Sequence, residues 1–177
     1  MEASTVTQTI HRLLTNRLEI AYAMGSIVPM AEIYFYHLEQ TPLSAILPDL
    51  LRRGLSRGLR MAVETSAPEN LEKISAMLWG TEDVSFLPHG YADDVAETQP
   101  IWLSADVENR NQAVFKFYVD GALPAELDDL QRALIMIDSN SEEALISARS
   151  EWKKRKSEGH DVKYYKRDEN GVWQNLA

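Results

Sequence analysis

The sequence predicts an α/β fold, a Rossmann-like three-layer sandwich with a largely parallel central sheet. Two patterns favour this class. Short β-branched and aromatic stretches alternate along the chain with stretches in which apolar residues recur at helical spacing. Some strand-like stretches are also apolar at every position, as residues 134–137 are, and continuous apolar strands are typical of a parallel sheet that helices cover on both faces.

The expected elements follow one another from residue 33 onward. Apolar and β-branched stretches predict strands at 33–38, 59–64, 84–87, 101–103, 114–119, 134–137 and 162–166, with an extended piece at 172–174. Helical spacing predicts helices at about 41–55, 67–78, 123–132 and 139–158. Residues 93–99 and 106–112 are polar and are expected to form loops and turns.

Local signals indicate where the helices begin. Thr41 and Pro42 are typical of a helix start, with Thr41 as the N-cap and Pro42 at the first helical position. Pro48 conflicts with a straight helix and should kink it or delay its start. Ser139 with Glu142 forms a capping box for the longest helix.

Residues 1–29 do not continue this pattern. They contain no clean signal-peptide core or small-residue cleavage site, and Met30 opens directly onto the first expected strand. We therefore expect the α/β domain to span 30–177. Residues 1–29 are then a flexible N-terminal extension or the product of a mis-set start, and we assign no function to them.

Composition excludes several classes of protein. Hydrophobic residues make up 45% of the 177 residues and charged residues 25%, which suits one globular domain with a real core. No apolar run approaches the roughly 18 residues that span a bilayer. The chain has no cysteine, which excludes disulfides, thiolate metal sites and cysteine nucleophiles.

Charge is unevenly distributed along the chain. The net charge is -9, whereas a protein that coats DNA is usually basic. Residues 149–167 nevertheless hold eight bases and three acids, so this segment carries +5 and the rest of the chain -14. A basic patch on an acidic protein indicates a specific anionic partner more than general nucleic-acid binding.

Two familiar enzyme motifs do not apply. Residues 54–58 read Gly-Leu-Ser-Arg-Gly, which matches the G-x-S-x-G pattern of serine hydrolases. That motif needs a strand before it and a helix after it, and the expected order here is reversed. The glycines also form neither a G-x-G pair nor a phosphate-binding loop, so we expect the fold without a nucleotide site and without any cofactor.

The histidines and paired carboxylates give no catalytic or metal pattern. His11, His37, His89 and His160 show no ligand spacing, so we expect no metal. The pairs at 93–94 and 128–129 consist of adjacent residues, whose side chains point apart, so surface solvation is the default interpretation.

The longest expected helix carries the sharpest feature. Arg149, Trp152, Lys153 and Lys156 fall at positions i, i+3, i+4 and i+7, so they share one face. A tryptophan among cations suits a peptide that ends in an aromatic residue and a carboxylate. The alternative, that Trp152 is buried and the lysines only fringe the core, is about equally supported by spacing. Gly159 stands where a left-handed helix cap belongs.

A second notable run covers residues 79–90. It contains Trp79, Phe86, Pro88 and His89 in a connection between elements. By itself this run favours core packing over a partner surface.

Together these residues resemble the chi subunit of bacterial DNA polymerase III over about four-fifths of the chain, from 31 to 174. The order and combination of the motifs are specific, although no single motif is. The resemblance is carried by residues 35–38, 78–79, 85–90, 100–103, 148–149, 152–153, 159–160, 164–165, 168–171 and 173.

The resemblance implies a non-catalytic subunit of the clamp-loader assembly that tethers the replicase to single-stranded-DNA-binding protein. Members have a Rossmann-like fold without a nucleotide site and bind the acidic C-terminal tail of that protein. By position, Arg149 and Lys153 would bind the carboxylates of the tail, and Trp152 would wall the pocket for its terminal phenylalanine. Lys156 lies on the same face, and Gly159 would shape the pocket edge.

The resemblance also implies a second interface, for the psi subunit or another clamp-loader component, or in some members a helicase. Trp79 and Phe86 match its aromatic positions, with Pro88 and His89 alongside. DNA would be contacted only indirectly, no membrane would be involved, and the protein would be cytoplasmic, associated with the nucleoid through the replisome.

Two other functions remain open at the level of the sequence. One is an α/β enzyme that uses a small nucleotide or a hydrolytic Ser56. The other is a protein that binds single strands directly through the basic segment and its aromatic residues. The absent glycine motif opposes the first, and the charge of -9 opposes tight binding by the second.

Overall fold

The computed structural model describes residues 30–39, 41–80 and 86–177, and residues 31–177 form one compact unit. It confirms the α/β class. Within these residues one sheet has the strand order β3-β4-β2-β5-β6-β1-β7-β8. All neighbouring strands are parallel except β7 and β8. The strands are β1 (Glu32–Leu38), β2 (Met61–Thr65), β3 (His89–Gly90), β4 (Ile101–Ser104), β5 (Phe115–Val119), β6 (Arg132–Asp138), β7 (Val162–Arg167) and β8 (Trp173–Asn175).

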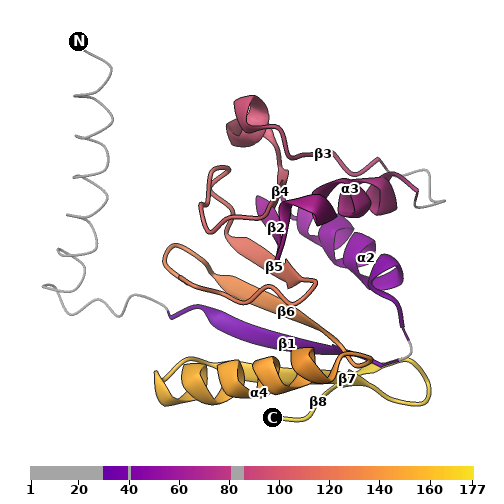
Figure 1. The fold of residues 1–177 in the computed structure, drawn as a ribbon, viewed down its shortest axis with the longest axis vertical. Helices are drawn as coiled ribbons and strands as arrows, with labels where there is room; N and C mark the ends of the chain where they lie inside the picture. Colours follow the sequence, from indigo (N-terminus) through magenta and orange to yellow (C-terminus); the bar gives the residue numbers. More distant parts are fainter. Residues whose placement is uncertain (1–29, 40, 81–85) are drawn as a thin grey trace, which may run out of the picture. The chain divides into compact units, whose positions relative to one another are not determined.

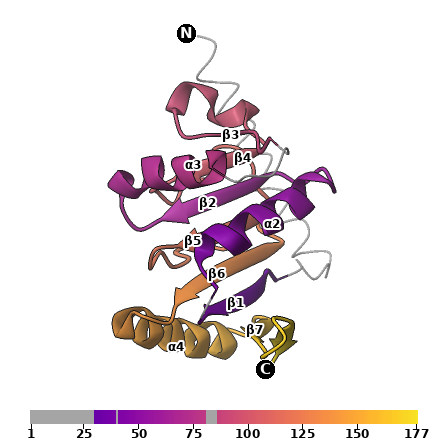
Figure 2. The same cartoon turned by 90° about the vertical axis from the view of Figure 1, so that its right-hand side faces the viewer.

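Helices pack on both faces of the sheet. They are α2 (Leu43–Leu55), α3 (Leu71–Trp79) and α4 (Glu142–Ser157). Figure 1 shows α2 and α3 together beside β2, and α4 along the other end of the sheet near β1 and β7. In Figure 2 α2 crosses in front of β5 and β6.

The alternation of side chains along β1 separates the two cores. Tyr34 and Tyr36 point to the core that contains residues of α2 and α3. Ile33 and Phe35 point to the core that contains Ala148 of α4. A strand that is apolar on both faces can satisfy both layers, which is why the continuous apolar strands predicted a covered parallel sheet.

The first helix differs from its predicted start. It begins at Leu43 with Pro42 as the N-cap, and no side chain caps it, so the prediction of Thr41 as N-cap was wrong. Thr41 instead accepts a hydrogen bond from Arg167. Pro48 is buried inside the helix. Its missing N–H affects only the carbonyl of Ser44 in the exposed first turn, so the helix continues through it.

The start of α4 was also misassigned. Its N-cap is Ser141, whose Oγ accepts a hydrogen bond from the Ala144 N–H at 3.1 Å. Ser139 lies in the preceding turn and donates to the carbonyl of Leu38. The capping box predicted from Ser139 was therefore wrong by two residues, while the helix itself is confirmed.

Other parts of the prediction were also wrong. No helix forms at 123–132, because residues 123–131 are irregular, contain Pro124 and turn through Asp129 at φ 64°, and Arg132 begins β6. Residues 93–98 form a 3₁₀ helix rather than a loop. Phe86 and Leu87 are not in a strand, and the short β3 begins at His89. Residues 84 and 85 of that predicted strand, and all of 1–29, lie outside the described residues.

Candidate functional site

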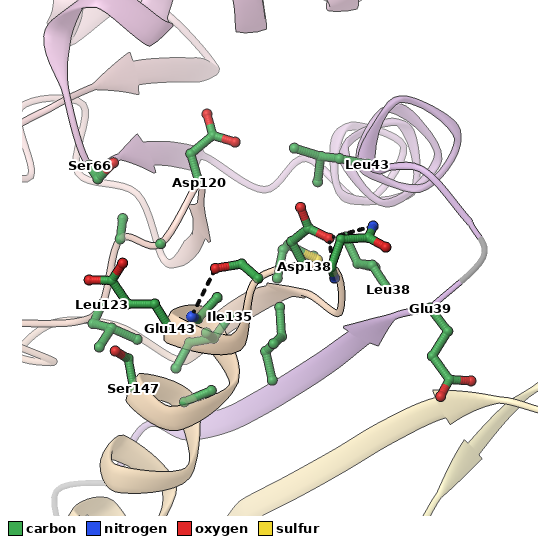
Figure 3. Close-up of a pocket in the computed structure, with 18 of the residues that line it drawn as sticks. Leu38, Glu39, Leu43, Ser66, Asp120, Leu123, Ile135, Asp138, Glu143 and Ser147 are labelled. Atoms are coloured by element: carbon green, nitrogen blue, oxygen red, sulfur yellow. Dashed lines mark hydrogen bonds between the residues drawn. The ribbon is translucent and has the colours of Figure 1, made fainter.

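A cavity of about 730 Å³ lies at the carboxyl ends of the central strands. From adjacent strands β1 and β6, the chain leaves to α2 on one face and to α4 on the other, which is where open α/β sheets usually bind ligands. Figure 3 shows Asp120, Asp138 and Glu143 around this crevice. No Lys or Arg is among the described residues that line it. An acidic crevice repels phosphate, in agreement with the missing glycine motif.

A smaller groove of about 300 Å³ lies between α4 and the sheet. Its helical wall comes from α4 and its floor from the central strands β1 and β6. Tyr164 of β7 and the C-terminal residue complete it. The lining residues are Phe35, His37, Ile137, Leu145, Ala148, Arg149, Trp152, Lys153, Tyr164 and Ala177.

The register of α4 determines which cations reach the groove. Arg155 is buried and faces away from it, donating to Glu151 at 2.5 Å, to Glu158 at 3.2 Å and to the carbonyl of Pro124. By contrast, Arg149 and Lys153 are exposed on the groove side. Neither has an ion-pair partner within the part of the chain that the structure describes. Of the five cations of α4, Arg155 is therefore structural, and Arg149 and Lys153 are the two that line the groove.

Trp152 falls between the two alternatives that spacing left open. Its side chain is half-buried and packs against the core on the α4 side, yet it also lines the groove. Its indole N–H is buried and has no hydrogen-bond partner. Lys156 lies with Nζ 4.4 Å from the ring centroid, so it covers the indole and does not line the groove. Gly159 adopts φ +90° after the end of α4, as predicted, and is likewise not among the lining residues.

The floor of the groove holds a polar pair that sequence reasoning missed. His37 Nδ1 is hydrogen-bonded to Tyr164 Oη at 2.7 Å, and the His37 Nε2 is buried without a partner. Burial lowers the pKa of His37, and the positive charges of Lys166 and Arg149 lower it further, while Glu39 raises it. The available signal was the period-2 spacing of Phe35 and His37, which places both on one face of the first strand.

The second predicted surface is exposed. Trp79 and Phe86 are 60% and 66% exposed, and their ring centroids lie 5.3 Å apart. The interpretation of this run as core packing was therefore wrong. The His89 ring lies 5.2 Å from that of Trp79, and half-buried Pro88 is adjacent in the chain. A contiguous exposed aromatic cluster of this kind is typical of an interaction site.

Two hydrogen bonds orient His89 within this cluster. Its Nδ1 is 2.7 Å from the carbonyl of Leu87, and its Nε2 is 3.0 Å from the Ser75 hydroxyl. Because a carbonyl can only accept, Nδ1 carries the proton and Nε2 accepts from Ser75. The imidazole is thus fixed beside Trp79 and helps to hold the aromatic cluster in place.

Comparison with known families decides the relationship. Residues 30–163 match the family model of the DNA polymerase III chi subunit, HolC. The chain belongs to the chi subunit family. Members of the chi family are accessory subunits of DNA polymerase III, so this chain is a replication accessory subunit. No curated protein matches the chain significantly.

The residues that match the family model include the exposed aromatic cluster and most of the groove, but not the groove wall formed by Tyr164 and Ala177. The exposed aromatic cluster and the cations of α4 lie inside 30–163, whereas Tyr164 and Ala177 follow the matched segment. Among the described residues, no helix has the length and apolar character needed to cross a bilayer.

Proposed function

We propose that this chi-family chain links DNA polymerase III to single-stranded-DNA-binding protein by binding the acidic C-terminal tail of that protein in the groove beside α4. One observation carries the proposal. Arg149 and Lys153, both exposed, border a groove whose other lining residues are mostly apolar or aromatic. A peptide end with a hydrophobic side chain and nearby carboxylates complements this arrangement.

Size and charge assign different roles to the parts of the groove. A volume of about 300 Å³ suits one large side chain with its backbone, and Phe35, Leu145 and Trp152 supply the apolar contact. Each exposed charge pair contributes at most about 1 kcal/mol, whereas full burial of a phenylalanine-sized side chain contributes about 1.5–3 kcal/mol. The apolar anchor therefore supplies most of the affinity, and the two cations supply selectivity and faster association.

Local charge strengthens the selectivity. The segment 149–167 carries +5 on a chain whose remainder carries -14. An acidic peptide is repelled by most of the surface and attracted to this segment, so the field steers it to the groove. The same distribution opposes direct binding of single-stranded DNA.

The exposed aromatic cluster provides the second contact of the adaptor. Trp79 and Phe86, with Pro88 and His89, are proposed to bind the psi subunit, another clamp-loader component or a helicase. The cluster lies beside β3 at one end of the strand order, whereas the groove lies over β6, β1 and β7, toward the other end. Two partners can therefore bind at once, which an adaptor in the bacterial cytoplasm requires.

Peptide binding tests the proposal. A fluorescent acidic peptide that ends in phenylalanine is titrated with the full chain and with the variants Arg149→Ala and Lys154→Ala. Lys154 is an exposed cation of α4 that does not line the groove, so it is the matched control. Arg149→Ala should weaken binding by roughly twofold to fivefold, and Lys154→Ala should change it little.

Two further measurements separate the alternatives. Added salt should weaken peptide binding, because exposed cations make the charged contacts. Removal of the terminal phenylalanine from the peptide should abolish most of the affinity. Equal affinity for peptides with and without that residue, or tight binding of a single-stranded oligonucleotide by the chain alone, would contradict the proposed function.

A further inference from the structure

One wall of the groove comes from residues that follow β8. The Leu176 N–H donates to the carbonyl of Tyr164 at 2.8 Å, which continues the pairing of β7 with β8 by one residue. The Ala177 N–H then donates to Asn175 Oδ1 at 3.3 Å. These bonds hold Ala177 at the groove, beside Tyr164 and across from the side chains of α4.

This wall lies beyond the residues that match the family model. The family match ends at residue 163, while Arg149, Trp152 and Lys153 lie within it. The helical wall and most of the floor thus belong to the region shared with the family, and the remaining wall, with Tyr164 and Ala177, lies beyond it.

We infer that Ala177 determines which peptide ends the groove accepts, by limiting its size on the side of β7. The inference rests on the proposed function and names a further residue of the same site. Ala177 is exposed and carries a small side chain, and the groove volume of about 300 Å³ leaves room for one large residue of a ligand. A larger side chain at 177 competes with the ligand for that volume.

Charge at position 177 should also change the affinity, although less than size does. The groove already presents the cations of Arg149 and Lys153, and Ala177 is neutral in its side chain. A side-chain carboxylate at 177 would add negative charge beside these cations and repel an acidic peptide. An ammonium there would add a third cation to the rim and attract the same peptide.

Three substitutions at one position test the inference in the full-length chain. Affinity for the acidic phenylalanine-ended peptide is measured by fluorescence polarisation for Ala177→Trp, Ala177→Glu and Ala177→Lys. Val172→Trp and Val172→Glu are the matched controls, because Val172 is exposed in the same hairpin and does not line the groove. Thermal melts of all variants verify the fold.

Ala177→Trp should weaken binding by about tenfold, because it fills volume that the ligand needs. Ala177→Glu should weaken binding and Ala177→Lys should strengthen it, each by about threefold at low salt and less at high salt. The Val172 variants should bind as the unmodified chain does. Ala177 variants that bind no differently from the Val172 variants would overturn the inference.

The failure of the inference is distinct from failure of the proposed function. If the unmodified chain binds the peptide and Arg149→Ala weakens it, while all three Ala177 variants bind normally, the groove is correct and Ala177 does not select its ligand. If the unmodified chain does not bind the peptide, both the proposed function and the inference are refuted.

Discussion

Arg155 and Arg149 are two arginines of α4 with opposite expected roles, and substitution separates them. Arg155 has a side chain only 7% exposed, and its partner Glu151 is 10% exposed. Arg155→Ala removes three contacts, to Glu151, to Glu158 and to the carbonyl of Pro124. The main consequence is a buried carboxylate at Glu151 without its cation.

The magnitude follows from that unpaired carboxylate. Breaking a buried ion pair on one side costs about 3–5 kcal/mol, and the half-exposed Glu158 adds little. We therefore expect Arg155→Ala to lower the free energy of unfolding by about 3 kcal/mol. For a domain of this size that corresponds to a fall in Tm of about 6–12 °C. Arg149→Ala, at an exposed position, should change the free energy by less than about 0.5 kcal/mol.

Urea unfolding followed by circular dichroism measures the two free energies. A double variant, Glu151→Gln with Arg155→Met, supplies the control, because removal of both charges should recover part of the loss. An Arg155→Ala variant as stable as the unmodified chain would refute the assignment of Arg155 as structural. So would an equal loss for Arg149→Ala, since that residue would then also hold the fold together.

Further predictions concern three residues: His37, Gly54 and Trp79. Burial lowers the pKa of His37, so near its ordinary pKa of about 6.5 the unfolded chain binds more protons than the folded chain. The free energy of unfolding should therefore fall as the pH drops through that value. In urea titrations at several pH values, His37→Gln should make this fall smaller. Peptide binding should strengthen over the same range, because an anionic ligand favours the protonated imidazole; a flat affinity profile from pH 7.5 to 5.5 would contradict this. A Cβ at the buried Gly54 would lie 2.2 Å from Met61 Sδ, so Gly54→Ala should cost about 1–3 kcal/mol in thermal melts, and an unchanged Tm would show that Met61 moves freely. Trp79→Ala should leave Tm and the affinity for the tail peptide unchanged, and it should weaken binding of the clamp-loader partner in a pull-down. A lowered Tm would show that Trp79 instead stabilises the fold.

Local patterns were sufficient for most of the fold. Periodicity identified the three α-helices of the described residues and most of their apolar strands, because binary patterning directly reflects which face is buried. They failed where a distant contact or a backbone turn decided the outcome. The segment 123–131 has helical leucine spacing, yet Pro124 and the positive φ of Asp129 interrupt it. The carbonyl of Pro124 is instead an acceptor for Arg155 of α4.

The N-cap of α4 was also decided by a contact between segments that are distant in the sequence. Ser139 was predicted as the N-cap because it stands three residues before Glu142, whereas Ser141 is the N-cap in the structure. The parallel pairing of β6 with β1 brings the turn after β6 beside the end of β1, where Ser139 donates to the carbonyl of Leu38. That contact engages Ser139 and leaves Ser141 to cap α4.

Helical periodicity alone was enough to place Arg149, Trp152 and Lys153 on one face, since neighbours three and four residues apart are adjacent on any α-helix. Whether that face borders a groove depended on β1, which lies more than 100 residues earlier in the chain, and on the residues after β8. Phe35 and His37 reach it through the pairing of β1 with β7, and Ala177 reaches it through the pairing of β7 with β8. Such contacts between distant segments arise from burial of the whole sheet, and no local spacing in the chain encodes them.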